Sequence, residues 1–323
     1  MFKIGVVGAG LIGDSHKSAI EKHPECVMTA VCDLNEEKAK ILAEGTDAKI
    51  YTDYKEMVLK EDIDIVILNL PHFLHREATV FCLDNGKHVL CEKPMAMSVS
   101  ECDAMINAAN KSGKKLAIGH MQKYSTANIL AKKFYDEKTY GKLCRITHVC
   151  NAMYFKDTRP KWFLDKKTAG GGILINYGAH GLDKIYSITG LAVSEVYAVG
   201  NNFLTDDNIE AGAQVLLKLD GGESAVMTFS GEQGGIINET LYYYTNGIVK
   251  VVDDGDLFIS VDDQPFEQIP LEYTHMIGDQ LFDFIRYIKG EENTMATGEY
   301  GREVIKVLEK AFKMIEKGGN INV

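Results

Sequence analysis

The sequence lacks the features of several common protein classes. No segment reaches the roughly 18 uncharged apolar residues of a membrane-spanning helix, and four glycines interrupt the apolar stretch Ile4 to Gly13, which argues against a signal peptide. The seven cysteines are odd in number and contain no C-x-x-C pair, so we expect neither a disulfide framework nor a zinc ribbon. The 35 basic residues form no long run and are outnumbered by 46 acidic ones, which makes nucleic acid an unexpected partner. These absences predict a protein of the reducing cytoplasm that binds neither membrane nor nucleic acid.

Metal-ligand spacing and linker sequences are missing as well. No set of His, Cys and Asp residues has the spacing of a metal site, so we expect no metal, and a zinc-type dehydrogenase is excluded. Only six prolines occur, and no proline-rich linker marks a domain boundary. What the chain has is a globular composition, with 46% apolar and 25% charged residues. At roughly 150 residues per domain, 323 residues predict about two domains.

The first 120 residues alternate short apolar runs with helical patterns. The runs are apolar on both faces, as strands of a buried parallel sheet must be: Ile4 to Val7, Val27 to Cys32, Ile63 to Leu70, His88 to Leu90 and Lys115 to Ile118. Helices are predicted between them, from a cap at Asn35, from His75 to Asn85, and from a capping box of Ser98 and Glu101 up to Gly113. This alternation predicts a doubly wound α/β domain over residues 1–120.

Residues 121–323 follow a different pattern, because strands now succeed one another through turns. Seven strands are predicted: Leu143 to Met153, Glu195 to Asn202, Ala213 to Leu219, Ser224 to Ser230, Glu239 to Tyr244, Ile248 to Val252 and Leu257 to Val261. Two late helices are expected near Met276 to Lys289 and Glu299 to Lys317, to cover a sheet face or to dock back on the first domain. The second domain is therefore predicted to be α+β, built on a large, open, mostly antiparallel sheet.

A glycine motif between the first strand and the first helix predicts a dinucleotide site. In Gly8-Ala9-Gly10-Leu11-Ile12-Gly13 the first glycine permits a tight turn, the second lets the backbone approach a pyrophosphate, and the third allows close helix packing. Asp33 ends the second strand, where a carboxylate would bind both ribose hydroxyls of NAD and repel the 2′-phosphate of NADP. NAD is therefore favoured over NADP. The alternative for Asp33 is that it only caps the next helix.

A second motif, Glu92-Lys93-Pro94, follows the strand at His88 to Leu90, at the sheet edge where open α/β folds bind ligands. With the glycine motif, Pro71-His72-Phe73-Leu74-His75, and the segment Gly170-Gly171-Gly172 through Asn176 to His180, it resembles the Gfo/Idh/MocA oxidoreductases over essentially the whole chain. These enzymes act on sugars, inositols and related polyols.

The resemblance implies an N-terminal Rossmann domain, a C-terminal sheet that pairs subunits into a homodimer or homotetramer, and roles for single residues. Lys93 resembles the family's catalytic lysine, with a typically cis peptide bond to Pro94, and His180 its second polar group at the reacting hydroxyl. Glu92, His75 and Pro71 resemble cofactor-side residues. The chain departs from the family at Asn176, where aspartate is usual, and at His72, whose role we do not assign.

From these residues we expect an NAD-dependent enzyme that interconverts a secondary alcohol and a ketone on a sugar, inositol or polyol-like substrate. Lys93 is the expected acid/base, with His180 and Asn176 holding the hydroxyls. Two alternatives stay open: a glycoside hydrolase that oxidises its substrate transiently with bound NAD, and a catalytically inactive ligand-binding relative. Further candidates for the polyol site, not assigned to it, are Arg159, Trp162 and Tyr124, and we expect Tyr242 to Tyr244 to line a sheet face or subunit interface.

Overall fold

The computed structural model describes residues 1–323 except 206–207, 233, 254 and 319–323. The chain forms two compact units. The first unit holds residues 1–121 and 275–305, and the second holds residues 122–274 and 306–323. None of the described helices is both long enough and apolar enough to cross a bilayer.

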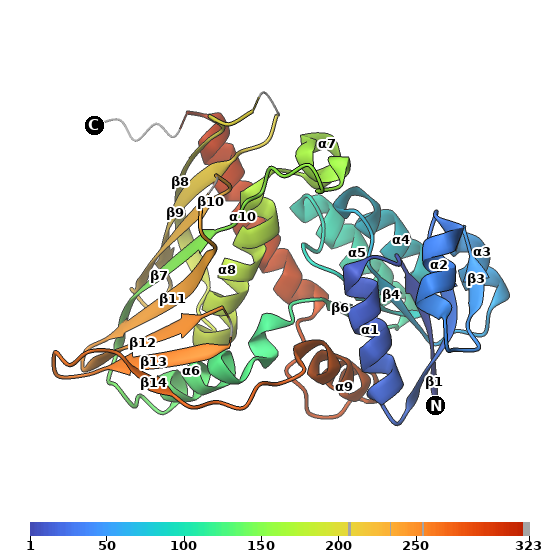
Figure 1. Cartoon of the computed structure of the whole chain (residues 1–323), viewed down its shortest axis with the longest axis horizontal. Coiled ribbons are helices and arrows are strands. Elements are labelled where there is room, and N and C mark those ends of the chain that lie inside the picture. Colours follow the sequence, from blue (N-terminus) through green and yellow to red (C-terminus); the bar gives the residue numbers. More distant parts are fainter. Residues whose placement is uncertain (206–207, 233, 254, 319–323) are drawn as a thin grey trace. The chain divides into compact units, whose positions relative to one another are not determined.

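A parallel sheet of six strands forms the centre of the first unit, in the order β3-β2-β1-β4-β5-β6 (Figure 1). Its strands are β1 (Phe2–Val7), β2 (Cys26–Cys32), β3 (Lys49–Tyr51), β4 (Ile65–Leu68), β5 (His88–Cys91) and β6 (Leu116–Ile118). The helices are α1 (Leu11–Lys22), α2 (Glu36–Ala43), α3 (Tyr54–Lys60), α4 (His72–Asp84), α5 (Val99–Ser112), α9 (Met276–Lys289) and the start of α10 (Gly298–Glu316). The predicted Rossmann architecture is therefore confirmed.

Local sequence signals explain several helix ends in this unit. The Asn35 side chain accepts hydrogen bonds from the backbone N–H groups of Glu37 and Lys38 and so caps α2, as predicted. Ser98 accepts the N–H of Glu101, and Gly113 ends α5 in the left-handed conformation. Strand β3 and helix α3 were not predicted. Strand β3 gives little apolar signal, because it has only three residues and is largely exposed at the sheet edge.

Helix α9 completes the core of the first unit although it lies far along the chain. Its buried residues Ile277, Leu281 and Phe284 belong to the same apolar cluster as Ile4 of β1 and Ile20 of α1. The rings of His23 and Phe282 lie 4.0 Å apart, and Lys289 forms an ion pair of 2.7 Å with Glu25. Burial of this apolar face therefore fixes the far end of α1, the helix that follows the glycine motif.

The second unit is built on an eight-stranded sheet in the order β14-β13-β12-β11-β7-β10-β9-β8 (Figure 1). Its strands are β7 (Leu143–Asn151), β8 (Val193–Asn201), β9 (Gly212–Leu219), β10 (Ser224–Ser230), β11 (Ile237–Tyr244), β12 (Gly247–Val252), β13 (Asp256–Ser260) and β14 (Glu267–Ile269). All pairs are antiparallel except β7 with β10. The predicted mostly antiparallel sheet is confirmed, with one parallel pair at its centre.

Helices cover one face of this sheet. They are α6 (Thr126–Asp136), α8 (Ile173–Thr189) and the end of α10. The short helix α7 (Lys166–Ala169) packs against the 3-10 turn Lys161–Leu164, and another 3-10 turn spans Gln122–Tyr124. Helix α8 packs on β7, β9 and β10 and is almost entirely buried. Tyr242 and Tyr244 are buried, and Tyr243 between them is only partly so, as strand alternation requires.

Candidate cofactor and active site

The glycine loop leaves space where a dinucleotide would need it. Gly8 has φ +97°, and a Cβ there would lie 2.3 Å from the carbonyl oxygen of Asn69. A Cβ at Gly13 would lie 2.6 Å from the carbonyl oxygen of Gly8, whereas one at Gly10 would meet no atom within 4 Å. Gly8 and Gly13 are therefore required for the turn and the packing, and Gly10 leaves an open approach to the backbone.

The start of α1 is suited to an anion. The helix begins at Leu11, next to Ile12, and its N-cap residue, Gly10, has no side chain to cap the first N–H groups. Free N–H groups and the helix dipole favour negative charge at this end. Together with the open side of Gly10, this arrangement fits the pyrophosphate of a nicotinamide dinucleotide.

Asp33 is held against the glycine loop. Its Oδ2 accepts the backbone N–H of Ala9 at 2.9 Å, and its Oδ1 accepts the N–H of Asn35 at 2.8 Å. Each carboxylate oxygen has further acceptor capacity for a ribose hydroxyl. The alternative that Asp33 caps the next helix does not hold, because Asn35 is the cap of α2.

Glu92, Lys93 and Pro94 follow β5 at the same edge of the sheet as the glycine loop. Parallel pairing sets β4 between β1 and β5, so the carboxyl ends of the three strands lie in a row. Lys93 is partly buried, and its peptide bond to Pro94 is cis. The first unit thus brings Lys93 to the edge that carries the dinucleotide loop.

His75 connects the segments after β4 and β5. Its Nδ1 lies 2.8 Å from the carbonyl oxygen of Pro94 and its Nε2 lies 2.7 Å from that of Leu70, so the ring joins the Pro71 turn to the Lys93 segment. Burial lowers the pKa of His75, although both carbonyl groups oppose this. The ring of His72 lies 5.8 Å from that of His75 and is also buried. In this geometry His75 orients the loop backbone.

His16 is a site residue that the sequence did not reveal. It lies on α1, fully buried, with its Nε2 3.1 Å from Oε1 of Glu92. Burial acts to raise the pKa of Glu92, but the hydrogen bond and charge of His16 and the charge of Lys93 outweigh it, so that the pKa is lowered. A histidine in the second turn of the helix has no periodicity signal of its own, and only the tertiary contact identifies it.

In the second unit, α8 carries both Asn176 and His180 one helical turn apart. The ring of Tyr177 lies 6.5 Å from that of His180 and 6.3 Å from that of Tyr154, which is fully buried. Burial raises the pKa of Tyr154, against the charge of Arg159 and a hydrogen bond from Asn176. Tyr154, which no sequence pattern singled out, therefore lies beside Asn176.

The further candidates for the polyol site, Arg159, Trp162 and Tyr124, differ in their contacts with Tyr154. The guanidinium of Arg159 lies 4.0 Å from the Tyr154 ring centre and 5.0 Å from that of Phe163, which itself stacks on Trp162 at 3.7 Å. Arg159 therefore contacts Tyr154 directly, whereas Trp162 is linked to Arg159 through Phe163. Tyr124 is buried in a short 3-10 turn.

The glycines before α8 have a packing role. A Cβ at Gly172 would lie 2.0 Å from the carbonyl oxygen of Glu210, and one at Gly171 would lie 2.5 Å from the ring of Phe312. Oε1 of Glu210 accepts the N–H groups of Gly172 at 2.8 Å and Leu174 at 2.9 Å, so this side chain caps α8 from a distant segment. The glycines therefore let α8 start close enough to Glu210 to place Asn176 and His180.

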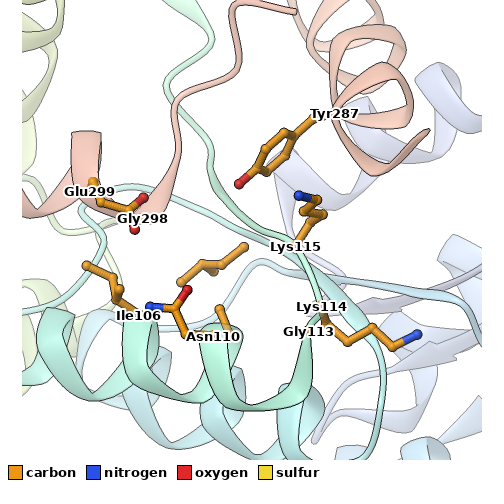
Figure 2. A pocket seen from close by; sticks show the side chains of 10 residues that line it. Ile106, Asn110, Gly113, Lys114, Lys115, Tyr287, Gly298 and Glu299 are labelled. Atoms are coloured by element: carbon orange, nitrogen blue, oxygen red, sulfur yellow. The ribbon is translucent and has the colours of Figure 1, made fainter. Parts of the chain in front are cut away.

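A surface pocket of about 170 Å³ lies elsewhere in the first unit (Figure 2). It is lined by residues including Asn110, Lys115, Tyr287 and Glu299, and Nζ of Lys115 lies 4.7 Å from the ring centre of Tyr287. Lys115 and Leu116 mark the amino end of β6, opposite the edge that carries Gly8 and Lys93. This pocket is therefore separate from the candidate cofactor site. Within the described residues, no group of three or more His, Cys, Asp or Glu side chains could hold a metal ion.

Comparison with known proteins agrees with this geometry. Residues 2–120 match a family model described as "Oxidoreductase family, NAD-binding Rossmann fold", and residues 129–242 match the GFO/IDH/MocA C-terminal domain. The chain is 25% identical to myo-inositol 2-dehydrogenase of Thermotoga maritima, over 99% of this chain and 98% of that protein. It is 31% identical to 1-carboxy-3-chloro-3,4-dihydroxycyclohexa-1,5-diene dehydrogenase of Comamonas testosteroni, over 57% of this chain but only 46% of that protein.

Among solved structures, one from Desulfitobacterium hafniense, described as an NADPH-dependent oxidoreductase, superimposes with a TM-score of 0.90 at 18% identity, over 98% of this chain and 96% of that one. At this identity the likeness concerns the fold. The two family models cover most of the first unit, apart from residues 275–305, and most of the second unit. The chain belongs to the Gfo/Idh/MocA family of NAD(P)-binding oxidoreductases.

Proposed function

We propose that this protein is an NAD-dependent dehydrogenase that interconverts a secondary alcohol and a ketone on a sugar, inositol or polyol-like substrate. The observation that carries the proposal is the shared sheet edge of the first unit, where the open Gly10 loop, Asp33 and Lys93 follow neighbouring strands. The names of the two relatives, dehydrogenases of inositol and of a dihydroxylated carbocycle, support a substrate with several hydroxyl groups.

The division of labour follows from the side chains. When bound, NAD supplies the group that accepts hydride, and the protein orients the substrate and manages its hydroxyl proton. Lys93 is proposed to take up that proton during alcohol oxidation and return it during reduction. His180 and Asn176 are proposed to hold substrate hydroxyls, and Tyr154 lies beside the Asn176 side chain.

The preference for NAD rests on Asp33. Its carboxylate is fixed by the N–H groups of Ala9 and Asn35, and the next residue, Leu34, brings no cation that could neutralise a 2′-phosphate. We therefore propose that NAD binds more tightly than NADP, although the Desulfitobacterium protein is described as NADPH-dependent. Fluorescence titration with both cofactors checks this, and tighter NADP binding would contradict the assignment of Asp33.

The domain roles and assembly belong to the same proposal. We assign cofactor binding to residues 1–120 and substrate binding and oligomerisation to residues 121–323. The outer face of β8, β9 and β10 presents Tyr197, Val199, Leu216 and Val226, each at least 39% exposed, which suits a homodimer or homotetramer formed through this sheet. All seven cysteines are free thiols, which suits a reducing cytoplasm.

The experiment is a panel of sugars, inositols and polyols incubated with the protein and NAD, followed by NADH absorbance. The proposal predicts NADH formation in an amount that matches the ketone produced. Cleavage of a glycosidic bond without net NADH would instead identify the hydrolase alternative. Binding of NAD and polyol without turnover would identify the inactive relative.

A further inference from the structure

Helix α1 reaches across the first unit to the residue that precedes Lys93. His16, in its second turn, has no exposed surface, and its Nε2 lies 3.1 Å from Oε1 of Glu92. Among the residues that the structure describes, Nδ1 of His16 has no hydrogen-bond partner. The contact with Glu92 is therefore the polar interaction that fixes this ring.

Glu92 is confined on its other sides. A Cβ at Gly119 would lie 2.8 Å from the Glu92 carboxyl carbon, so the bare backbone of Gly119 leaves the space that this side chain occupies. Oε2 of Glu92 accepts the backbone N–H of Lys93 at 3.2 Å. One carboxylate oxygen thus contacts His16 on α1, and the other contacts the Lys93 backbone.

The charged neighbours of Glu92 explain its ionisation. Its carboxyl group interacts with His16, with Lys93 and, more weakly, with His75. The Glu92 side chain is largely buried, with 13% of its surface exposed. A carboxylate in such a position needs hydrogen-bond donors to remain ionised, because burial favours the neutral form. Without His16, the Lys93 segment and the weaker interaction with His75 would remain to oppose the effect of burial.

We propose that His16 is a positioning residue that keeps Glu92 ionised and in place beside Lys93, and thereby sets the lower pH limit of Lys93 chemistry. The inference rests on the proposed function of Lys93 and extends it to a pair that sequence motifs do not identify. The hydrogen bond of Glu92 to the Lys93 backbone then depends on a helix that directly follows the dinucleotide loop.

The first test is the pH profile of alcohol oxidation with the best substrate of the panel. In His16→Ala the pKa of Glu92 rises, so Glu92 becomes neutral at a higher pH and there ceases to hold the Lys93 segment in place. The acid limb of kcat, which reports this ionisation of Glu92, therefore moves upward by about one unit or more. His16→Gln, whose amide can donate from a similar position, restores most of the original limb. His23→Ala is the matched control, because His23 is a buried histidine at the other end of the same helix, packed against the ring of Phe282.

A second test needs no turnover and separates this inference from the proposed function. The melting temperature of His16→Ala falls below that of the parent, and the gap is widest at neutral pH and narrows as pH falls through the lowered pKa of Glu92. The sign follows because an ionised Glu92 with a lowered folded-state pKa stabilises the fold above its unfolded pKa and loses this contribution on protonation. In a Glu92→Gln background the gap no longer depends on pH.

The outcomes separate cleanly. A pH-dependent gap in a protein that oxidises no polyol would keep the His16–Glu92 pair and overturn the dehydrogenase proposal. A gap of equal size at every pH in both backgrounds, with His16→Gln no better than His16→Ala, would show that His16 only fills space and would overturn this inference.

Discussion

Two glycine-rich segments, one in each unit, each precede a helix, and they work in opposite ways. In the first, a Cβ at Gly10 would meet no atom within 4 Å, and Gly10 as the N-cap of α1 provides no side-chain cap. In the second, Gly171 and Gly172 press against Phe312 and Glu210, and Glu210 caps α8. Similar sequence therefore leaves open space beside the backbone in one unit and allows close packing in the other, and what surrounds the missing Cβ distinguishes the two.

The largest expected effect lies beside the first glycine segment. Lys93→Ala should lower kcat for alcohol oxidation by about 10²–10⁴-fold, because general acid/base help is lost. NAD affinity should stay within a few-fold of the parent, since the glycine loop and Asp33 are untouched. Steady-state kinetics with a parallel NAD titration check both. Turnover within threefold of the parent would remove Lys93 from its role.

A substitution in the second glycine-rich segment should lower the stability of the fold. Gly172→Ala brings a methyl group to 2.0 Å from a backbone oxygen that cannot rotate away, so we expect a loss of about 3 kcal/mol or more in the free energy of unfolding. Urea denaturation followed by circular dichroism measures it. A variant as stable as the parent would mean that the start of α8 is not constrained by Glu210.

Gly10→Ala should show the reverse pattern. With no atom within 4 Å of the new Cβ, the fold should keep its stability or gain up to about 1 kcal/mol, because alanine restricts the unfolded chain. NAD affinity should fall about tenfold or more, since the methyl group occupies the approach to the pyrophosphate. Thermal unfolding and NAD titration on one sample test this, and unchanged affinity would mean that the loop does not hold the cofactor.

A smaller effect is expected on the helix that the second segment begins. Asn176→Asp places a negative charge one turn from His180, which favours the protonated imidazole. The pH at which kcat/KM for oxidation rises should move upward by a measurable fraction of a unit. Asn176→Ala is the control, because it removes the amide without adding charge. An unchanged limb with chemistry rate-limiting would show that this position does not sense the catalytic proton.

The smallest expected effect concerns Glu210, the side chain that caps α8. Burial raises the pKa of Glu210 although it accepts backbone N–H groups, so its ionised form destabilises the fold relative to the protonated form. The stability of the parent should therefore decline as pH rises above the ordinary glutamate value of 4.5, relative to Glu210→Gln, whose amide oxygen still accepts both bonds. Melting temperatures of both proteins across this range decide it, and parallel curves would count against an ionised cap.

Much of the fold could be predicted because its signals are local. The strand at Ile65–Leu68 is apolar on both faces, and Asn35 and Ser98 cap the helices that their sequences indicate. Strand β3 was missed because it is short and exposed, and α8 was missed because burial on nearly all sides removes its helical periodicity.

The candidate site residues also differ in whether their signals are local. Gly8, Asp33 and Lys93 follow strands and can be found from spacing, whereas three other residues matter through distant contacts. His16 contacts Glu92, Tyr154 lies beside Asn176, and Glu210 caps α8. Such contacts join segments far apart in the chain, so no single stretch of sequence encodes them.

The central claim is that the hydrogen on the carbinol carbon of the substrate is transferred as hydride to the cofactor bound by the glycine loop. The direct measurement uses the best substrate of the panel with deuterium on its carbinol carbon, and mass spectrometry of the nicotinamide cofactor after reaction with NAD. The account predicts one deuterium in the reduced cofactor and an equal amount of ketone. Unlabelled cofactor, with the substrate unchanged, would contradict it.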